Sequence, residues 1–411
     1  MERVVITGMG LVSPLGNDVG VFWNNLISGK SGISRIDTMD TTNLKTKIAG
    51  TVRDFNIEEC IGLKNSSRLD RFCQFALFAA EKAWEDSMLT FENLDRNRMG
   101  VYVGSGTGGI QTLIDNVDTL RNRGTRRVSP ALVPSIITNA ASAQISIKWG
   151  AMGPSLSPVS ACAIGNTSIG EAFKSIRLGE TDVIFAGGAE ASITELSLAS
   201  FNNAKAISTL NDVPARASRP FDSKRDGFVM SEGASILILE SLSHALKRNA
   251  RIHAEVIGYG ASSDAYHMVS THPEGEGAYL AMKTAVKNAN ISPTEIDMIS
   301  AHATSTVTGD ISETRAIKKM FGNQAYKIPI TANKSMLGHM LGASGGVEAI
   351  ALVKSLQEGI IPPTINMEQA DPLCDLDYVP NVARKGNFTI GLSNSFGFGG
   401  HNAVIVLKKY V

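Results

Sequence analysis

Short hydrophobic runs alternate along this chain with stretches in which apolar residues recur at helical spacing. Near-continuous runs, most of them rich in β-branched residues and flanked by glycine, predict buried strands at 3–8, 99–104, 182–190, 236–239, 254–260, 297–302, 389–392 and 402–407. Helical spacing predicts helices at 21–28, 71–87, 136–149, 167–178, 277–289 and 346–358. This alternation predicts an α/β protein with mostly parallel sheets.

The order of these elements restarts near residue 251. The strand at 254–260 and its glycine exit resemble the opening strand at 3–8, and the strand at 297–302 is placed as the strand at 99–104 is. The pattern predicts an internal duplication, with one half over residues 1–250 and the other over 251–411. Because no low-complexity linker separates the halves, we expect one compact body.

Composition excludes several classes of protein. The 411 residues are 43% hydrophobic, and 39 Lys+Arg balance 39 Asp+Glu, so no global field attracts nucleic acid or an anionic membrane. The four cysteines form no CxxC pair, which argues against a zinc site or a disulfide framework and fits a reducing cytosol. No apolar run approaches the roughly 18 residues of a membrane span, and no signal peptide precedes the first strand, so we expect a soluble cytoplasmic protein.

The glycine-rich stretch 8–16 invites comparison with a dinucleotide-binding loop. A third glycine is missing at the required place, and Pro14 interrupts the helix that would hold the pyrophosphate. We therefore do not expect a nucleotide there. The helix at 136–149 carries no charge until Lys148, which predicts burial in the core or in a subunit interface.

Cys162 follows a small-residue approach and precedes a predicted helix. A thiol at a helix N-terminus faces unpaired N–H groups and the positive end of the helix dipole, which favour the thiolate and lower the thiol pKa. Cys162 is thus a candidate nucleophile. The alternative is one more buried small residue, which most free cysteines are.

Chemistry at a cysteine usually needs an imidazole, and two of the seven histidines stand out. His302 ends an apolar strand and enters a hydroxyl-rich turn, and His339 lies in the glycine-rich stretch 334–346. The stretch 394–402 is a further glycine loop that could turn backbone N–H groups toward an oxyanion, or be a plain turn between two terminal strands. Loops at the carboxyl ends of parallel strands are where α/β proteins place ligands.

Together these stretches resemble the β-ketoacyl-acyl-carrier-protein synthases. The resemblance rests on the segments 160–162, 302–306, 334–346 and 394–402, with support from 219–222 and 225–228, and it runs over the whole chain. It is closest to the elongating type II enzymes of bacterial fatty-acid synthesis. It implies a thiolase-like fold, in which duplicated mostly parallel sheets form a five-layered αβαβα body, and a homodimer.

The resemblance also implies roles for individual residues. Cys162 would take an acyl group as a thioester, and the backbone N–H groups of Cys162 and Phe398 would form the oxyanion hole. His302 and His339 would stabilise the enolate formed when a malonyl thioester loses CO2, and Lys334 would orient this cluster. Glu348 and Asp310 would not contact the substrate but would hold the residues of this cluster in position. Phe398 would gate the acyl tunnel, and the substrate-binding residues would be Thr304, Thr306, Thr107 and Ser270.

The implied partner is acyl carrier protein, loaded with an acyl or a malonyl group on its own phosphopantetheine, so that no further cofactor and no metal are expected. The carrier is acidic, and a basic patch is expected at the tunnel mouth. The residues in family-like places are Lys64, Arg68, Arg126, Arg127 and Lys205.

Some residues depart from the family pattern. Ala303 stands where the family usually has glycine, Thr107 where it usually has a bulky aliphatic residue beside the acyl pocket, and Ile164 and Asn166 also differ. These changes bear on the acyl-chain preference more than on the reaction.

Other readings remain alternatives. The chain could be the ketosynthase of a polyketide or another specialised acyl pathway, or a non-catalytic partner subunit that shapes a chain-length tunnel, although such subunits lose the cysteine. A thiolase would need a second catalytic cysteine, and Cys374 has no glycine-rich loop. A starter condensing enzyme would carry asparagine at His339.

Overall fold

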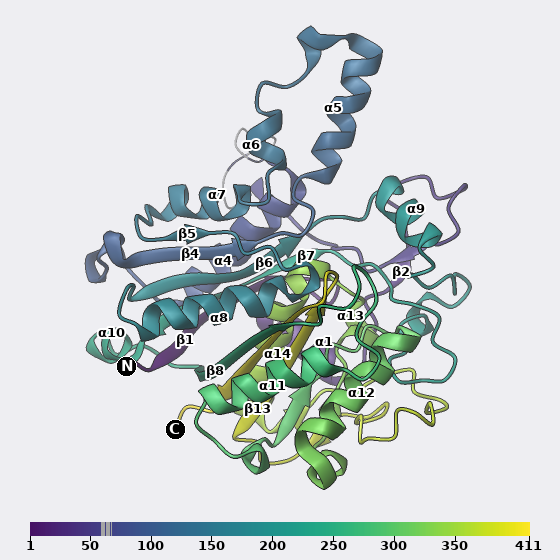
Figure 1. The fold of residues 1–411 in the computed structure, drawn as a ribbon. Helices are drawn as coiled ribbons and strands as arrows, with labels where there is room; N and C mark the ends of the chain where they lie inside the picture. Colours follow the sequence, from purple (N-terminus) through teal and green to yellow (C-terminus); the bar gives the residue numbers. More distant parts are fainter. Residues whose placement is uncertain (59–61, 63–65, 67) are drawn as a thin grey trace.

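One mixed sheet extends through the molecule in the computed structural model, which describes residues 1–58, 62, 66 and 68–411 (Figure 1). Its strands are β1 (Val4–Val12), β4 (Met99–Gly104), β5 (Ser155–Leu156), β6 (Val183–Glu190), β7 (Gly233–Ser241), β8 (Ala254–Ser263), β9 (Met298–Ser300), β10 (Ile330–Thr331), β13 (Ile390–Gly397) and β14 (His401–Lys408). Two small ribbons pair β2 (Ser34–Arg35) with β3 (Ile48–Ala49) and β11 (Ile360–Ile361) with β12 (Arg384–Lys385).

The predicted duplication is visible in the strand order. The ten strands run β10-β9-β13-β14-β8-β1-β7-β6-β4-β5, so that β5-β4-β6-β7-β1 in one half matches β10-β9-β13-β14-β8 in the other. In each half the two outer pairings are parallel and the two inner ones antiparallel. The halves join where β1 pairs antiparallel with β8.

Helices form the other layers of the five-layered arrangement that the resemblance implies. They are α1 (Val19–Ile27), α4 (Arg71–Ser87), α5 (Ile110–Arg123), α6 (Leu132–Ile136), α7 (Ala140–Trp149), α8 (Ile164–Arg177), α9 (Glu195–Asn203), α10 (Leu242–Lys247), α11 (Glu276–Asn288), α12 (Val307–Phe321), α13 (Lys334–Leu337) and α14 (Ser344–Glu358). Helices α4 and α7 cover the outer face of the first half-sheet, and α11 and α12 cover that of the second. Helices α8 and α14 lie between the two half-sheets.

Close packing, and not nucleotide binding, accounts for the glycines of the opening strand. A Cβ on Gly10 of β1 would lie 2.1 Å from the carbonyl oxygen of Ala79 in α4. In the second half, a Cβ on Gly260 of β8 would lie 2.1 Å from the carbonyl oxygen of Ala281 in α11. Each outer helix therefore approaches its strand too closely for any side chain at these positions.

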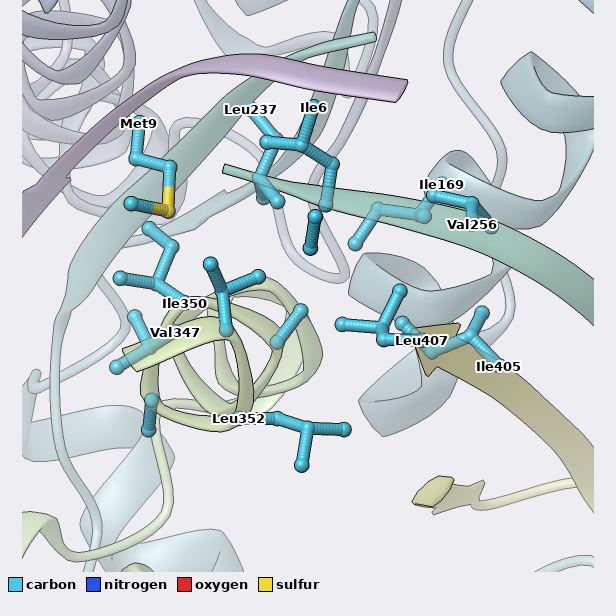
Figure 2. Packing of buried hydrophobic residues seen from close by; sticks show 14 of the residues in the cluster. Ile6, Met9, Ile169, Leu237, Val256, Val347, Ile350, Leu352, Ile405 and Leu407 are labelled. Atoms are coloured by element: carbon cyan, nitrogen blue, oxygen red, sulfur yellow. The ribbon is translucent and has the colours of Figure 1, made fainter. Parts of the chain in front are cut away.

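The central layer holds the largest cluster of buried side chains. Val347, Ile350 and Leu352 of α14 pack with residues of both half-sheets (Figure 2). The two central helices meet at their first turns, where a Cβ on Gly165 would lie 2.4 Å from the backbone nitrogen of Gly346. The N-termini of α8 and α14 are thus brought side by side, and the residues just before them come from equivalent places in the two halves.

The structure corrects two predicted helices. Of the stretch predicted at 136–149, only Ala140–Trp149 forms one helix, α7, and Ile136 is the last residue of the separate helix α6. Helix α8 begins at Ile164, three residues before the predicted start at 167. Its first turn packs on backbone at Gly165, so the amphipathic pattern that locates most helices begins only later in the sequence.

Helices α5, α9 and α12 were not predicted. Helix α5 contains no buried residue and forms, with α6, an arm that projects from the body (Figure 1). The apolar residues of α5 nevertheless recur at helical spacing, at Ile110, Leu113, Ile114, Val117 and Leu120, so the sequence does carry the signal of this helix. In the described part of the chain no helix is long and apolar enough to cross a membrane.

Candidate active site

The predicted site residues of both halves meet at one cavity of about 650 Å³. Cys162 of the first half lines it together with His302 and His339 of the second. A larger, more open groove of about 1180 Å³ lies elsewhere, near Asn17, Arg53 and Lys82, and none of the predicted catalytic side chains lines it. The smaller cavity is therefore the candidate active site.

Cys162 lies in a single 3₁₀ turn, Ala161–Ala163, that leads directly into α8. Ala161 has a φ of +50°, a left-handed conformation that is uncommon for a residue with a side chain and that bends the chain sharply before the cysteine. The backbone N–H groups of Phe398 and of Cys162 itself are directed toward the sulfur and act to lower its pKa. Backbone amides beside a nucleophilic sulfur can stabilise an oxyanion that forms there.

The prediction that the helix terminus lowers the thiol pKa is wrong for the resting protein. Burial raises the pKa of Cys162 to about 12, and the negative charge of Glu190 adds to the rise. The charge of Lys334 and the two amides oppose it without overcoming it. The dipole of α8 acts on a sulfur that sits in an apolar cluster, and there the loss of hydration dominates.

The two imidazoles lie against each other and face the cavity from separate loops. His302 follows β9 and His339 follows α13, and their ring centroids are 5.4 Å apart at an interplanar angle of 87°. The edge of one ring meets the other, and Phe228 packs on His339 with a centroid distance of 5.4 Å. Both side chains are buried, so their positions are fixed by packing as well as by hydrogen bonds.

Both histidines are neutral near neutral pH. Burial lowers the pKa of His302 and of His339 well below the usual value, and the charge of Lys334 lowers both further. Lys334 Nζ lies 3.5 Å from Nδ1 of His302, and an ammonium can only donate, so the ring proton of His302 sits on Nε2. Nδ1 of His339 lies 3.1 Å from Oγ of Ser344. A hydroxyl that donates to this nitrogen leaves Nε2–H of His339 as a second donor.

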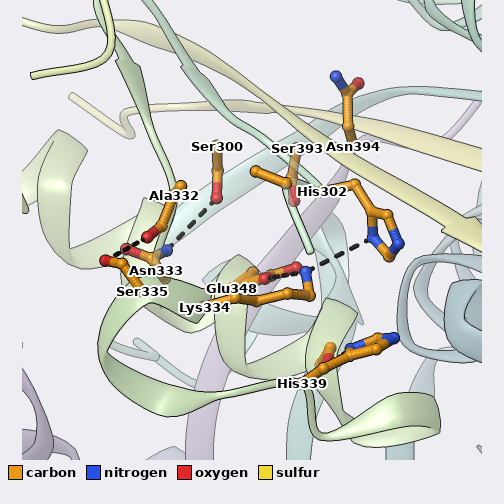
Figure 3. Close-up of polar contacts among 12 residues, drawn as sticks. Ser300, His302, Ala332, Asn333, Lys334, Ser335, His339, Glu348, Ser393 and Asn394 are labelled. Carbon is orange, nitrogen blue, oxygen red and sulfur yellow. Dashed lines mark hydrogen bonds and ion pairs between the residues drawn. The ribbon is translucent and has the colours of Figure 1, made fainter. Parts of the chain in front are cut away.

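Lys334 is held by a buried ion pair. Its ammonium binds Oε1 of Glu348 and lies between this carboxylate and His302, as Figure 3 shows. Burial raises the pKa of Glu348 to about 7, while the ammonium of Lys334 opposes the rise. Because Glu348 projects from α14 and Lys334 from α13, the pair fixes two elements of the second half around His302.

Asp310 supports the loop after His302 and not the lysine. It accepts hydrogen bonds from the N–H groups of Phe221 at 2.9 Å and Ser305 at 3.2 Å, and it pairs with Arg225 at 3.3 Å. Burial raises its pKa to about 7, and Arg225 opposes the rise. Of the two carboxylates predicted to support the cluster, Glu348 contacts Lys334 directly and Asp310 acts through the backbone of Ser305.

Glu313 is a site residue that the sequence reading did not single out. Its carboxylate accepts the N–H of His302 at 2.9 Å, the N–H of Ala303 at 2.8 Å and Nδ2 of Asn394 at 2.9 Å. Burial raises its pKa, while these hydrogen bonds lower it. Its distance of three residues from Asp310 on α12 is a helical spacing that could have indicated a second inward-facing acid.

The other predicted residues fall into three groups. Those that line the cavity are Thr107, Thr304, Thr306, Ser270, Lys205 and Phe398. Thr304 and Thr306 are hydrogen-bonded to each other at 3.0 Å, and the Phe398 side chain is 40% exposed. Arg68, Arg126 and Arg127 are exposed, the last two in the turn Thr125–Arg127 between α5 and α6, and Lys64 lies outside the described residues.

Three of the residues that depart from the resembled pattern, Ile164, Asn166 and Ala303, lie in or next to the turns that carry Cys162 and His302. Ile164 and Asn166 are buried, and Asn166 donates to the carbonyl oxygens of Ser393 and Ala403, so it ties α8 to the second half-sheet. Ala303 has a φ of +36°, a conformation that favours glycine. Among the residues that the structure describes, no group of three or more His, Cys, Asp or Glu side chains could hold a metal ion.

Comparison with protein families gives two consecutive matches. The N-terminal domain model of β-ketoacyl synthases matches residues 1–245, and the C-terminal domain model matches residues 253–368. Curated relatives match over the whole chain. A protein of Staphylococcus aureus strain N315 named 3-oxoacyl-[acyl-carrier-protein] synthase 2 is 47% identical over 409 residues, covering 100% of this chain and 99% of its own. A protein of the same name from Synechocystis is 45% identical, covering 100% and 98%.

Solved structures also match this chain over its whole length. The ketosynthase of the AntDE:AntF complex, described as a type II polyketide acyl-carrier protein with its ketosynthase bound to the hexaketide, superposes with a TM-score of 0.92 at 35% identity. A β-ketoacyl synthase from Burkholderia phymatum superposes with a TM-score of 0.93 at 34% identity. Both comparisons cover 100% of each chain, so the whole fold is shared.

Proposed function

The chain belongs to the β-ketoacyl synthase family, and we propose that it catalyses the decarboxylative condensation of an acyl thioester with malonyl-acyl-carrier protein in fatty-acid elongation. The products are a 3-oxoacyl-carrier protein and CO2. The observation that carries the proposal is that Cys162, His302 and His339 line one cavity, with two backbone amides at the sulfur.

The first half of the reaction charges the cysteine. Sγ of Cys162 attacks the carbonyl carbon of an acyl thioester, and the oxygen of the tetrahedral intermediate receives hydrogen bonds from the N–H groups of Cys162 and Phe398. The C–S bond to the carrier then breaks, and the thiol proton of Cys162 leaves with the phosphopantetheine thiol. Because the resting thiol has a raised pKa, deprotonation is coupled to the attack and does not precede it.

The second half breaks a carbon–carbon bond and forms another. The malonyl thioester loses CO2, and the electron pair of the broken bond becomes an enolate whose oxygen lies at Nε2–H of His302 and His339. Two neutral imidazoles are suited to this task because they donate hydrogen bonds to charge that appears only in the transition state. The enolate carbon attacks the thioester on Cys162, and the sulfur leaves as a thiolate and takes a proton from solvent.

Lys334 is the positioning group of this cluster. Its hydrogen bond to Nδ1 of His302 selects the tautomer that presents Nε2–H to the cavity, and its ion pair with Glu348 keeps the ammonium in place. Phe398 supplies a backbone donor, and its exposed ring stands at the cavity as a gate. Thr304, Thr306 and Ser270 are placed to bind the phosphopantetheine arm.

The partner proposed is acyl carrier protein, which brings both substrates on its own phosphopantetheine. The condensation balances without an oxidant, a reductant or a nucleotide, so we propose no further cofactor. The cationic patch proposed for the carrier comprises Lys64, Arg68, Arg126, Arg127 and Lys205. Lys205 stands at the cavity, and the arginines are exposed where a partner can reach them.

A homodimer is proposed for the assembly, in a soluble protein of the cytoplasm. The edge strand β5 and the adjoining helix α7 expose large apolar side chains, with Ile147 at 74% and Leu156 at 49% exposure. Apolar groups on an unpaired sheet edge favour pairing with a second copy of the same edge. We also propose that the two halves divide as 1–250 and 251–411, the second beginning just before β8.

The test is the intact mass of the protein after incubation with acyl-carrier protein, for the wild type and Cys162→Ala. We expect an acyl increment on the wild type alone, which disappears with formation of 3-oxoacyl-carrier protein when malonyl-carrier protein is added. A wild type that no acyl chain charges would rule out the condensing function and leave the non-catalytic partner subunit.

A ketosynthase of a polyketide pathway is the second candidate. It is favoured by the AntDE:AntF structure, whose ketosynthase is 35% identical to this chain. In the same experiment, repeated extension of one acyl chain without reduction between rounds would indicate this function.

A further inference from the structure

The hydroxyl of Thr167, a residue of α8, contacts the chain on both sides of Cys162. Its Oγ1 lies 3.0 Å from the carbonyl oxygen of Ala163 and 2.7 Å from Oγ of Ser160. A carbonyl oxygen can only accept, so the proton of Thr167 goes to Ala163 and the hydroxyl of Ser160 donates to Thr167. One side chain thus connects the two residues that flank the segment Ala161–Cys162.

The segment between these two residues is strained. Ala161 has a φ of +50°, and a left-handed backbone costs a residue with a Cβ about 1–2 kcal/mol. Such a conformation persists where the surrounding contacts hold it. The N–H of Ala163 donates to the carbonyl oxygen of Ser160 at 3.0 Å and closes the turn, and Thr167 adds a second connection between the same two residues.

Helix α8 is a fixed support for this connection. Before Thr167, a Cβ on Gly165 would lie 2.4 Å from the backbone nitrogen of Gly346 in α14. After it, a Cβ on Gly170 would lie 2.2 Å from Cδ2 of Tyr259, a buried residue of β8. A shift of this part of α8 would therefore have to displace either the backbone of α14 or a buried ring, and packed interiors resist both.

The same turn also contacts the strand that leads to Phe398. A Cβ on Gly397, the last residue of β13, would lie 2.6 Å from the carbonyl oxygen of Ser160 and 3.0 Å from the backbone nitrogen of Cys162. The next residue is Phe398, whose N–H is directed toward the sulfur. The position of the turn between α8 and β13 therefore sets how Sγ of Cys162 lies relative to this donor.

We propose that Thr167 is a positioning residue that, through Ser160 and Ala163, aligns Sγ of Cys162 with the backbone donors of the oxyanion hole. The inference rests on the proposed condensation, because the oxyanion in question forms when an acyl thioester charges the cysteine. Without the hydroxyl the strained turn relaxes, and the sulfur and the donors no longer meet the acyl carbonyl group together. Reaction rates depend steeply on such alignment, so the charging step slows.

The test compares two reactions of Cys162 in Thr167→Val and Thr167→Ser. Valine keeps the size and the branching of threonine without the hydroxyl, and serine keeps the hydroxyl. The first reaction is charging by an acyl-carrier protein that charges the wild type, and it forms an oxyanion. The second is alkylation by iodoacetamide at the same pH, a displacement at a saturated carbon that forms none.

We expect charging to slow by about tenfold in Thr167→Val, as the loss of a buried hydrogen bond implies, and to stay near the wild-type rate in Thr167→Ser. Alkylation should stay within about twofold of the wild type in both, because it does not use the oxyanion hole. Adding Ser160→Ala to Thr167→Val should slow charging no further, since the hydrogen bond between the two hydroxyls is already lost.

Ser355→Ala is the matched control. The hydroxyl of this buried serine donates to the carbonyl oxygen of Ala351, four residues earlier, as that of Thr167 does to Ala163. It lies toward the other end of the second central helix, α14, away from the turn that precedes it. We expect both reactions of Cys162 to keep their wild-type rates in this variant.

The outcomes separate the inference from the function on which it rests. Unchanged charging in Thr167→Val overturns the inference and leaves the condensation intact. Charging and alkylation that slow equally would show that Thr167 supports the fold and not the alignment, and slow charging in Thr167→Ser would assign the effect to the lost methyl group; either result also overturns the inference. A wild type that no acyl-carrier protein charges overturns the condensation itself.

Discussion

The ammonium of Lys334 lies 3.5 Å from Nδ1 of His302 and binds the carboxylate of Glu348 on its other side. This contact decides which nitrogen of His302 carries the proton, and so it decides that the cavity receives a hydrogen-bond donor. His339, with its pKa also lowered by burial and by Lys334, stands at right angles to it. In the proposed condensation, this pair donates hydrogen bonds to a developing anion.

We expect His302→Ala and His339→Ala each to slow condensation by about 100- to 1000-fold, because each removes one donor to the enolate oxygen. Charging of Cys162 should persist in both variants, since the oxyanion hole for that step is made of backbone amides. Intact mass measures the charging, and release of 3-oxoacyl-carrier protein measures condensation. His253→Ala, a buried histidine outside this cavity, is the control and should retain both steps. Loss of charging in the histidine variants would contradict the assignment.

The alkylation of Cys162 by iodoacetamide should accelerate with pH throughout the range from about 6 to 10. The thiolate is the reactive form, and below the pKa its fraction rises about tenfold per pH unit. Because burial raises the pKa of this thiol to about 12, no plateau is expected in that range. The rate is measured by mass spectrometry, with Cys162→Ala to identify labelling of other cysteines. A plateau near neutral pH would mean that the helix dipole outweighs burial.

We expect Ala303→Gly to stabilise the protein by about 0.5–1 kcal/mol. At a φ of +36° alanine pays a steric cost of about 1–2 kcal/mol that glycine avoids, and the greater freedom of glycine in the unfolded chain offsets part of the gain. Chemical denaturation measures the difference in the free energy of unfolding. Ala301→Gly serves as the control, because Ala301 is buried nearby without a left-handed φ, and it should destabilise.

Glu313→Gln should destabilise the protein by about 1–3 kcal/mol, because an amide nitrogen would face N–H donors that now meet a carboxylate oxygen. It should also slow the malonyl half of the reaction more than the charging of Cys162, because the lost hydrogen bonds hold the backbone of His302 and Ala303. The two half-reactions and a denaturation curve test this. Glu274→Gln, an exposed acid paired with Arg315, should change neither. Equal slowing of both halves would show that Glu313 supports the fold only.

The protein should sediment as a dimer, and Ile147→Glu should shift it toward the monomer. Ile147 is 74% exposed on α7 beside the edge strand β5, and a charge there would be buried without a partner in the proposed interface. Leu178→Glu is the matched control, since Leu178 is 67% exposed at the far end of α8 and should leave the assembly unchanged. An unchanged dimer in Ile147→Glu would move the interface to another face.

The sequence alone determined the class of the fold, its duplication and the three side chains of the proposed chemistry. Buried strands and the amphipathic helix 71–87 are written in local periodicity, which reports how each segment meets a core. The stretches around Cys162, His302 and His339 are distinctive because sharp turns and close backbone contacts restrict which residues they accept.

Only the tertiary structure decided how those residues behave. The helix dipole at Cys162 is a local property that the sequence displays, whereas the desolvation that raises its pKa depends on Phe228, Leu341 and other residues far away in the chain. Glu313 gains its role in the same way, in part through the side-chain amide of Asn394, which folding brings to it from a distant segment. Helix spacing and turn chemistry act over a few residues, but burial and the satisfaction of buried charge are properties of the whole packed chain.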